Sequence, residues 1–270
     1  MESPVPNSPD DARRFGGIAR LYGAAGRARL AQAHVCVVGI GGVGAWAAEA
    51  LARSGVGRLT LIDLDHVAES NINRQIHAAD ATLGQAKVEA MRERIAGYSP
   101  GCVVTVVDDF VTVDNAARLL GGGFDYVIDA IDAVRVKVAM IAVCHGLEVP
   151  VVTCGAAGGQ IDPTRIQVAD LARTIQDPLL AKVRGQLRKS HAFPRDPKKK
   201  FGVEAVFSSE PLRYPAPEGA CEAGAGGPAG LNCAGFGSVV TVTACVGLFA
   251  AARVLNGLSA GPAPDPVSGA

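Results

Sequence analysis

The chain has 270 residues, 49% of them hydrophobic, so it can bury the core of one large domain or of two small ones. Its 26 basic and 26 acidic residues give a formal net charge of zero, which excludes a chain-wide attraction to nucleic acid and leaves only local patches. The seven cysteines include no Cys-x-x-Cys pair, which disfavours a zinc site, and most stand in apolar stretches, as reduced thiols of a cytoplasmic protein do.

The start of the chain predicts a tail followed by helices. Residues 1–11 are polar and acidic, unlike a signal peptide, and we expect them to be disordered. Two short helices are predicted over 13–21 and 24–32, with the break between them next to Gly23.

A glycine-rich turn between two apolar runs is the strongest single pattern. The run that starts at His34 and the run 59–62 predict buried strands, and residues 43–54 between them predict a helix. The turn reads Gly39-x-Gly41-Gly42-x-Gly44, and the second strand ends on Asp63-x-Asp65. Glycines let the backbone approach a phosphate, the helix N-terminus offers free N–H groups, and an acid about 20 residues on suits a ribose hydroxyl. The stretch therefore predicts a βαβ nucleotide-binding unit.

Strands and helices then alternate. The pattern predicts helices over 84–96, 114–120 and 134–145, and strands over 103–107, 126–128 and 151–153. Such alternation predicts an α/β, Rossmann-like, doubly wound sheet that is mostly parallel.

After Gly155 the pattern changes. The remaining elements are a strand over 165–168, helical spacing over 171–187, a strand over 202–207, a long Gly/Ala/Pro loop over 214–235, an uncharged apolar stretch over 236–252 and a disordered tail over 257–270. The apolar stretch favours a core or dimer helix over a membrane span, with peripheral membrane association left open. We expect one domain over 12–256, with a nucleotide half at 34–155 and a substrate-facing part at 156–256.

The charges downstream of the glycine turn indicate which nucleotide binds. A dinucleotide carries two phosphate charges, whereas a nucleoside triphosphate carries about four and needs cationic side chains and a metal. Arg74 and Lys87 supply cations, and Asp129 and Asp132 stand at the carboxyl end of a strand, where one of them can hold Mg²⁺. These residues favour an ATP site over an NAD site.

Each of these residues also has a structural interpretation. Arg74 fits a solvated loop charge, and Lys87 fits an exposed helix charge paired with Glu89 or Asp80. Asp129 fits the cap of the following helix. A non-catalytic nucleotide-binding scaffold and an NAD oxidoreductase therefore remain as alternatives.

The constellation resembles the E1-like, or ThiF/MoeB/HesA, family of adenylating enzymes. The resemblance rests on the glycine turn and on the motifs Asp63-x-Asp65, Ser70-Asn-Ile-Asn-Arg74-Gln75, Gly84-x-x-Lys87 and Asp129-Ala-Ile-Asp132. It tightens towards the branch that cyclises threonylcarbamoyladenosine at position 37 of tRNA, through Asn73-Arg-Gln-Ile-His77, Gly155-Ala-Ala-Gly-Gly-Gln-Ile-Asp-Pro163 and Asp170-Leu-Ala-Arg-Thr-Ile-Gln-Asp-Pro178. It implies a Rossmann-like fold with an E1-like C-terminal extension, and adenylation of the substrate carboxylate.

The resemblance also implies a set of ATP-site residues. Gly41, Gly42 and Gly44 would contact the phosphates, and Asp63 would contact the ribose. Asn71 and Arg74 would meet the β- and γ-phosphates, with Gln75 and Lys87 beside them, while Gly39 and Asp65 complete the site. Asp132 would hold Mg²⁺, and a monovalent cation (Na⁺ or K⁺) is a further expected ion.

The sequence departs from the family in two places. Many members send an arginine into the partner subunit's site from a position that here is Gly17, so Arg20 and Arg14 are the candidates for a trans arginine within an expected homodimer. The paired Cys-x-x-Cys motifs of the sulfur-carrier activators are missing, which disfavours the alternative function, adenylation of the C-terminal glycine of a ubiquitin-like sulfur carrier. Cys233 is the best thiol candidate, with a bystander thiol as its alternative; a cysteine desulfurase and its sulfur acceptor are candidate partners.

A basic run over 181–201 predicts a tRNA contact surface. Its candidate residues are Arg184, Arg188, Lys189, Lys198, Lys199 and Lys200. Such a surface would bind RNA phosphates in a sequence-independent, salt-sensitive way. The alternative is a solvated face with no ligand, and DNA is not an expected partner.

Overall fold

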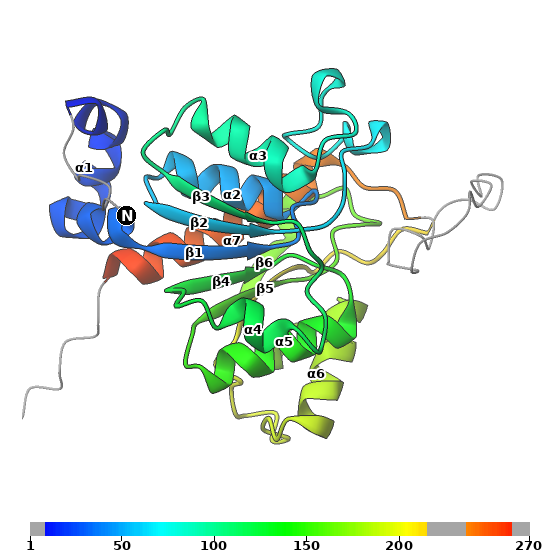
Figure 1. Cartoon of the computed structure of the whole chain (residues 1–270). Coiled ribbons are helices and arrows are strands. Elements are labelled where there is room, and N and C mark those ends of the chain that lie inside the picture. The colour runs from blue at the N-terminus through cyan, green and yellow to red at the C-terminus, as the bar shows by residue number, and fades with distance from the viewer. Residues whose placement is uncertain (1–8, 215–235, 261–270) are drawn as a thin grey trace, which may run out of the picture.

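The structure, a computed structural model, describes residues 9–214 and 236–260, and within them seven strands form one sheet (Figure 1). The sheet order is β3-β2-β1-β4-β5-β7-β6, and every neighbouring pair is parallel except β6 with β7. The strands are β1 (His34–Val38), β2 (Arg58–Ile62), β3 (Val103–Val107), β4 (Tyr126–Asp129), β5 (Val151–Cys154), β6 (Ile166–Asp170) and β7 (Glu204–Ser208). The predicted doubly wound, mostly parallel sheet is confirmed.

The strand order reverses between β1 and β4. The chain runs outward from β1 through β2 to β3, and then returns to place β4 on the other side of β1. In a sheet of this kind the loops after the two central strands diverge to opposite faces and leave a crevice at their carboxyl ends. The glycine turn follows β1 and the Asp129–Asp132 segment follows β4, so both meet at this crevice.

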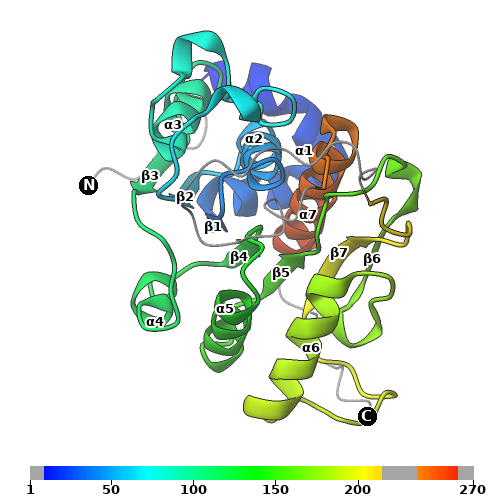
Figure 2. The same cartoon turned by 90° about the vertical axis from the view of Figure 1, so that its right-hand side faces the viewer.

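Helices cover both faces of the sheet (Figures 1 and 2). One face carries α1 (Pro9–Gln32), α2 (Gly44–Arg53), α3 (Lys87–Ala96) and α7 (Val240–Ala260), and the other carries α4 (Ala116–Leu120), α5 (Val134–Gly146) and α6 (Pro178–Ser190). Each layer has its own hydrophobic core, since the buried side chains form one large cluster on each side of the sheet. The valine-rich strands supply both cores, because their alternate side chains point to opposite faces.

The first helix begins earlier than the sequence indicates. It starts at Pro9, inside the segment expected to be disordered, and it breaks at Gly23, whose φ of 75° is outside the helical range. The break confirms the two predicted helical segments. An ion pair of 3.5 Å between Asp11 and Arg27 joins the two segments and accounts for the order of the earlier one.

The helix expected over 171–187 is shorter at its start. Residues 171–173 form a single 3₁₀ turn after β6, and α6 begins only at Pro178. The Asp177 carboxylate accepts a hydrogen bond of 2.8 Å from the Leu180 N–H, which caps the helix, and proline suits the first helical position. The capping acid followed by proline is the signal that marks this boundary in the sequence.

The apolar C-terminal stretch forms α7, which runs past the expected end at 252 to Ala260. By length and composition α7 is a candidate membrane span, but 44% of its most apolar window is buried within the fold. It packs so tightly on α2 that a Cβ at Gly247 would overlap the Val43 carbonyl. The tail predicted from 257 is helical as far as Ala260. The Arg29 guanidinium donates to the Leu258 and Ser259 carbonyls and so stabilises this end of α7. These contacts support the core-helix interpretation, while a dimer contact and peripheral membrane association stay predictions.

Candidate nucleotide-binding site

The turn after β1 is built for close approach. Gly39 has a φ of 87°, and a Cβ there would lie 2.9 Å from Ile131 Cγ2 and 3.0 Å from the Ala130 carbonyl oxygen. A Cβ at Gly44 would overlap the Gly39 carbonyl. The glycines therefore let the loops after β1 and β4 touch. α2 has no side-chain cap, and the Ala45 N–H donates to the Gly41 carbonyl at 3.2 Å, so an anion here would use the other N–H groups of the first turn.

Asp63 ties this turn to β2. One carboxylate oxygen accepts from the Ile40 N–H at 2.6 Å and the other from the Asp65 N–H at 2.8 Å. Burial raises the pKa of the Asp63 carboxyl, although the Lys87 charge and the two backbone N–H donors oppose that shift. Asp63 thus stabilises the shape of the turn, and a role in binding ribose remains a prediction.

Arg74 lies directly against the glycine turn. A Cβ at Gly42 would be 3.1–3.2 Å from the Cγ and Cδ of Arg74. The Arg74 guanidinium donates to the Ser70 carbonyl and the Asn73 side chain, both at 2.9 Å, and the Trp46 indole N–H donates to the Arg74 carbonyl at 2.9 Å. Burial lowers the pKa of this guanidinium. The arginine is therefore positioned at the phosphate loop, which contradicts the interpretation as a solvated loop charge.

Two amides accompany Arg74. Asn71 is buried, and its side-chain oxygen accepts from the Ala68 N–H at 3.0 Å. Gln75 is 4% exposed, its amide nitrogen is 4.0 Å from the position of a Cβ at Gly41, and its oxygen has no hydrogen-bond partner within the described residues. A buried amide with unused hydrogen-bonding capacity beside a phosphate loop is a candidate ligand contact.

Lys87 is buried rather than exposed. It is 6% exposed and pairs with the Asp65 carboxylate at 2.7 Å, whereas Glu89 pairs with Arg92. The interpretation as an exposed helix charge paired with Glu89 or Asp80 is therefore wrong, because the start of α3 points this side chain inward at the segment after β2. Lys87 and Asp65 together bring one cation and one exposed carboxylate to the rim of the crevice.

The two acids after β4 have different surroundings. Asp129 is fully buried, pairs with Lys137 at 2.9 Å and accepts from the Thr153 hydroxyl at 2.7 Å. Asp129 therefore stabilises the interior of the fold through these two contacts, and α5 has no side-chain cap. Asp132 is half-buried and has no hydrogen bond or ion pair with any other described residue. A free carboxylate at the crevice fits Mg²⁺, which binds through one or two carboxylates together with substrate phosphates.

The trans-arginine candidates lie away from this crevice. Figure 1 shows α1 at the end of the sheet where the strands begin, opposite the glycine turn. Arg14 donates to the Tyr98 carbonyl of its own chain at 2.7 Å, whereas Arg20 is exposed. Since α1 lies at that end, the structure does not bring either residue to the site of its own chain, and a trans arginine stays a prediction.

The basic run divides into two groups. Arg184 donates to Thr174, and Arg188 donates to the Pro194 carbonyl at 3.2 Å and covers the Phe201 ring, so both help to hold the fold. Lys189, Lys198, Lys199 and Lys200 are exposed. Among the six candidate residues, the cations available to a ligand are therefore the lysines at the end of α6 and in the loop after it; Lys182 and Arg195 of the same run are exposed as well.

The thiol candidate cannot be placed. Cys233 lies outside the described residues. Cys154, the last residue of β5, is buried, and burial raises the pKa of its thiol to about 12, so the reactive thiolate is scarce at neutral pH.

His77 is a buried group that the sequence does not single out. It is 3% exposed, and neither ring nitrogen has a hydrogen-bond partner in the described part of the chain. Burial, aided by the charges of Lys87 and Arg94, lowers the pKa of His77 to about 4. Its side chain is therefore neutral throughout the physiological pH range.

We expect this histidine to make the fold acid-sensitive. The unfolded chain binds a proton near pH 6.5 and the folded chain only near pH 4, so stability is full above about pH 6.5 and falls as the pH drops through that window. The expected loss by pH 4 is about 3 kcal/mol. Denaturant titrations between pH 7 and pH 4 should give a shallower pH dependence for His77→Gln. The exposed His191→Gln should keep the original slope, and equal slopes for all three proteins would contradict the prediction.

Comparisons with known proteins agree with this geometry. The ThiF family model matches residues 16–267. The chain is 55% identical over 252 residues to an Escherichia coli tRNA threonylcarbamoyladenosine dehydratase, covering 92% of this chain and 94% of that protein. It is 52% identical over 247 residues to the Haemophilus influenzae protein of the same name, covering 91% and 93%.

A solved structure extends the likeness to the fold. The crystal structure of E. coli tRNA N6-threonylcarbamoyladenosine dehydratase in complex with ATP matches with a TM-score of 0.84 at 52% identity, covering 94% of this chain and 96% of that one. By contrast, a Salmonella typhimurium molybdopterin-synthase adenylyltransferase aligns over only 52% of this chain, at 41% identity. With its glycine turn, its positioned arginine and lysine, and a family match that spans most of its length, the chain belongs to the ThiF family.

Proposed function

We propose that this chain is an ATP-dependent tRNA threonylcarbamoyladenosine dehydratase. The likeness to enzymes of that name covers more than nine-tenths of the chain. The sulfur-carrier alternative has less support, because the adenylyltransferase of that class aligns over about half of the chain.

The main support for the ATP assignment is the packing of Arg74 on Gly42, at the point where the strand order reverses between β1 and β4. One fixed guanidinium beside the phosphate loop, a buried lysine at the same rim and a free carboxylate at Asp132 suit a triphosphate with its metal. A dinucleotide needs little more than the glycine loop and the helix N-terminus. The positioned Arg74 guanidinium, together with a carboxylate that can hold a metal, therefore favours ATP with Mg²⁺ over NAD.

The family resemblance implies the reaction, and the charges of the crevice suit its first step. A carboxylate oxygen of the threonyl group attacks the α-phosphorus of ATP, the bond to the β-phosphate oxygen breaks, and pyrophosphate leaves. Arg74 and Lys87 stabilise the charge that grows on this leaving group, acting through position and electrostatics. Mg²⁺ held at Asp132 would supply further neutralisation of the phosphates.

The second step closes the ring. A nitrogen or oxygen of the neighbouring carbamoyl group attacks the acyl carbon, and AMP leaves with the former carboxylate oxygen. The substrate thereby loses the elements of water. Because the attacking group is tethered to the acyl carbon, no enzymic nucleophile is needed, and Cys233 is not required for ring closure.

The activity can be tested directly. A tRNA carrying threonylcarbamoyladenosine, incubated with the protein, ATP and Mg²⁺, should yield AMP, pyrophosphate and a nucleoside lighter by one water molecule in mass spectrometry. A tRNA that lacks the threonylcarbamoyl group is the control and should yield no AMP. AMP release driven by a ubiquitin-like carrier but not by the modified tRNA would favour the alternative function.

The assembly is also part of the proposal. The homodimer and its trans arginine rest on the family resemblance. Since α1 lies at the far end of the sheet from its own crevice, Arg20 would act only at the site of a second copy. A monovalent cation, and a cysteine desulfurase with its sulfur acceptor, rest on the family resemblance alone.

The tRNA is proposed to contact the part of the chain after residue 155. Neutralising Lys189, Lys198, Lys199 and Lys200 together should lower tRNA affinity about tenfold at low salt and reduce the slope of log affinity against log salt. Gel retardation across a salt series measures both quantities. Neutralising Arg13, Arg58 and Arg92, which are exposed on other elements, is the control; an unchanged slope in the lysine variant would contradict the prediction.

A further inference from the structure

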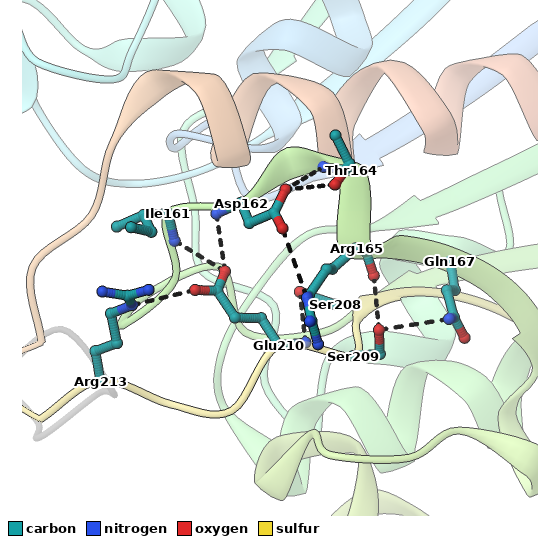
Figure 3. Close-up of polar contacts among 9 residues, drawn as sticks. All are labelled: Ile161, Asp162, Thr164, Arg165, Gln167, Ser208, Ser209, Glu210 and Arg213. Carbon is teal, nitrogen blue, oxygen red and sulfur yellow. Dashed lines mark hydrogen bonds and ion pairs between the residues drawn. The ribbon is translucent and has the colours of Figure 1, made fainter.

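A hollow outside the nucleotide crevice lies between the segment before β6 and the segment after β7 (Figure 3). Its volume is about 650 Å³. The walls combine apolar with charged side chains, namely Ile161, Pro163, Pro211 and Leu212 with Asp162, Arg165, Glu210 and Arg213. A mixture of this kind suits a ligand with one flat apolar part and one polar part.

The walls are held rigidly by Glu210. One of its carboxylate oxygens accepts from the Ile161 and Asp162 N–H groups at 3.0 and 2.8 Å, and the other accepts from Arg213 Nε at 3.2 Å (Figure 3). These donors lower the pKa of the Glu210 carboxyl. The hollow is therefore preorganised, because its two walls are joined before any ligand arrives.

The two arginines keep most of their hydrogen-bonding capacity. Arg213 uses its Nε for Glu210, and Arg165 uses its Nε for Asp162 at 3.5 Å. Among the described residues, no side chain or carbonyl accepts from the terminal nitrogens of either guanidinium, and the side chains are 63% and 54% exposed. These nitrogens can donate to phosphate oxygens or to the acceptor edge of a base.

The hollow lies on the same sheet edge as the nucleotide crevice. Since β7 is parallel to β5 and β4, its carboxyl end, which leads into Glu210, faces the same way as the end of β4. Two strand positions separate β7 from β4, roughly 10 Å along the edge. The two sites therefore open on one side of the molecule.

Hydrogen bonds connect the rims of the two sites. Asn73, the neighbour of Arg74, donates to the Ser238 carbonyl at 2.9 Å. The Gly159 N–H donates to the Gly237 carbonyl, and the Arg213 N–H donates to the Gly159 carbonyl, both at 2.8 Å. One continuous rim thus runs from the phosphate-binding arginine to the hollow.

An exposed aromatic side chain stands beside the hollow. Tyr214 follows Arg213, is 75% exposed, and rests on Phe236 with a centroid distance of 5.1 Å. Exposed aromatic rings next to arginines are the usual platforms on which proteins stack unpaired RNA bases.

We propose that the hollow and Tyr214 together bind one unstacked nucleotide of the tRNA loop, a neighbour of the adenosine whose carboxylate is activated. The base stacks on Tyr214 against the apolar wall, and its phosphate or acceptor edge meets Arg165 and Arg213. This inference rests on the proposed function, and it explains how a loop is held while its modified adenosine enters the crevice.

The test uses the whole protein and an anticodon stem-loop that carries threonylcarbamoyladenosine. Tyr214→Ala should weaken stem-loop binding about tenfold in fluorescence anisotropy, the range expected for loss of one base–aromatic stack. Arg165→Gln should weaken it less, and ATP affinity should be unchanged in both variants. The nucleotide before and the nucleotide after the modified adenosine are each replaced by an abasic unit in separate stem-loops. Only one of the two replacements should weaken binding to the unchanged protein. The same replacement should cause no further loss of binding in Tyr214→Ala, which already lacks the stacking partner.

Matched controls come from the segment after β3 and from α4, at the other end of the strand order from β6. Phe110 is a 49% exposed aromatic residue, and Arg118 is an exposed arginine with a single carboxylate partner at 3.7 Å, so Phe110→Ala and Arg118→Gln should bind as the unchanged protein does. If Tyr214→Ala and Arg165→Gln both bind the stem-loop as tightly as the unchanged protein does, this inference is wrong, and the proposed dehydratase function is unaffected. Failure of the unchanged protein to bind or dehydrate the stem-loop would overturn the proposed function and this inference with it.

Discussion

Replacing Lys137 with methionine is expected to cost about 3–5 kcal/mol of unfolding free energy, because it leaves the Asp129 carboxylate buried without its counter-ion. Both side chains are fully buried, and the ammonium is 2.9 Å from the carboxylate. Methionine fills a similar volume, so the loss reports the missing charge rather than a cavity. Equilibrium denaturation in urea measures it.

Two further variants isolate the cause of that loss. Arg92→Met breaks a partly exposed ion pair with Glu89 and should cost below about 1 kcal/mol. Combining Lys137→Met with Asp129→Asn removes both charges while keeping an acceptor for the Thr153 hydroxyl, and it should recover part of the stability. A double variant that is as unstable as the sum of the single ones would contradict the ion-pair explanation.

The same pair has a consequence for the site. Lys137 also lies 3.4 Å from the Asp129 carbonyl, so it fixes the backbone where β4 ends and the segment to Asp132 begins. A shift of that segment would move the carboxylate expected to hold Mg²⁺. We therefore interpret the buried Lys137–Asp129 pair as the contact that fixes the backbone leading to Asp132 and so positions its carboxylate.

Local sequence patterns were sufficient to predict the frame of the molecule. Valine-rich runs, the glycine turn and the helical spacing between strands each depend on neighbouring residues, so the alternating elements and the mostly parallel, doubly wound sheet could be predicted from them. The order of the seven strands was not predicted, because it depends on contacts between distant segments. The clustering of Arg74 with the glycine turn also followed, because ligand-binding loops gather at the carboxyl ends of parallel strands.

The partners of the charged residues could not be predicted in this way. The Lys87–Asp65 contact joins the start of α3 to the loop after β2, and the Lys137–Asp129 contact depends on how α5 lies against β4. One signal was present: Lys137 stands on the same helical face as the apolar Ile141 and Cys144, where a lysine needs a buried partner. The hollow at Glu210 left no such signal, since its walls come from segments about fifty residues apart.

Helix ends were the other source of error, and their causes are specific contacts. The start of α6 depends on the Asp177 cap, and the end of α7 depends on Arg29, which is distant in sequence. The first is readable as an acid before a proline, whereas the second requires the packing of α1 on α7. Tertiary contacts thus extend α7 beyond the point where its composition turns to small and polar residues.

Arg74→Ala is expected to lower kcat/KM for adenylate formation by about 10²–10³-fold, the effect of removing one preorganised donor from a developing anion. The guanidinium is fixed by Ser70 and Asn73 against Gly42, so it needs little reorganisation when charge grows on the leaving pyrophosphate. Pyrophosphate release with the modified stem-loop measures the effect. The substitution should leave the fold intact, because Trp46 is held by the Arg74 backbone carbonyl, which alanine retains.

Three comparisons separate transition-state stabilisation from simple binding. ATP affinity should fall much less than kcat/KM, since an interaction that strengthens only as the anhydride bond breaks contributes little to the ground state. Arg74→Lys keeps the charge but loses the planar fork, so it should recover only part of the rate. Arg58→Ala removes an exposed arginine at the start of β2, the end of the strands opposite the glycine turn, and should turn over at the original rate. If Arg74→Ala kept full turnover, the positioned guanidinium would have no part in catalysis, and a nucleotide-binding scaffold would be the better account of this crevice.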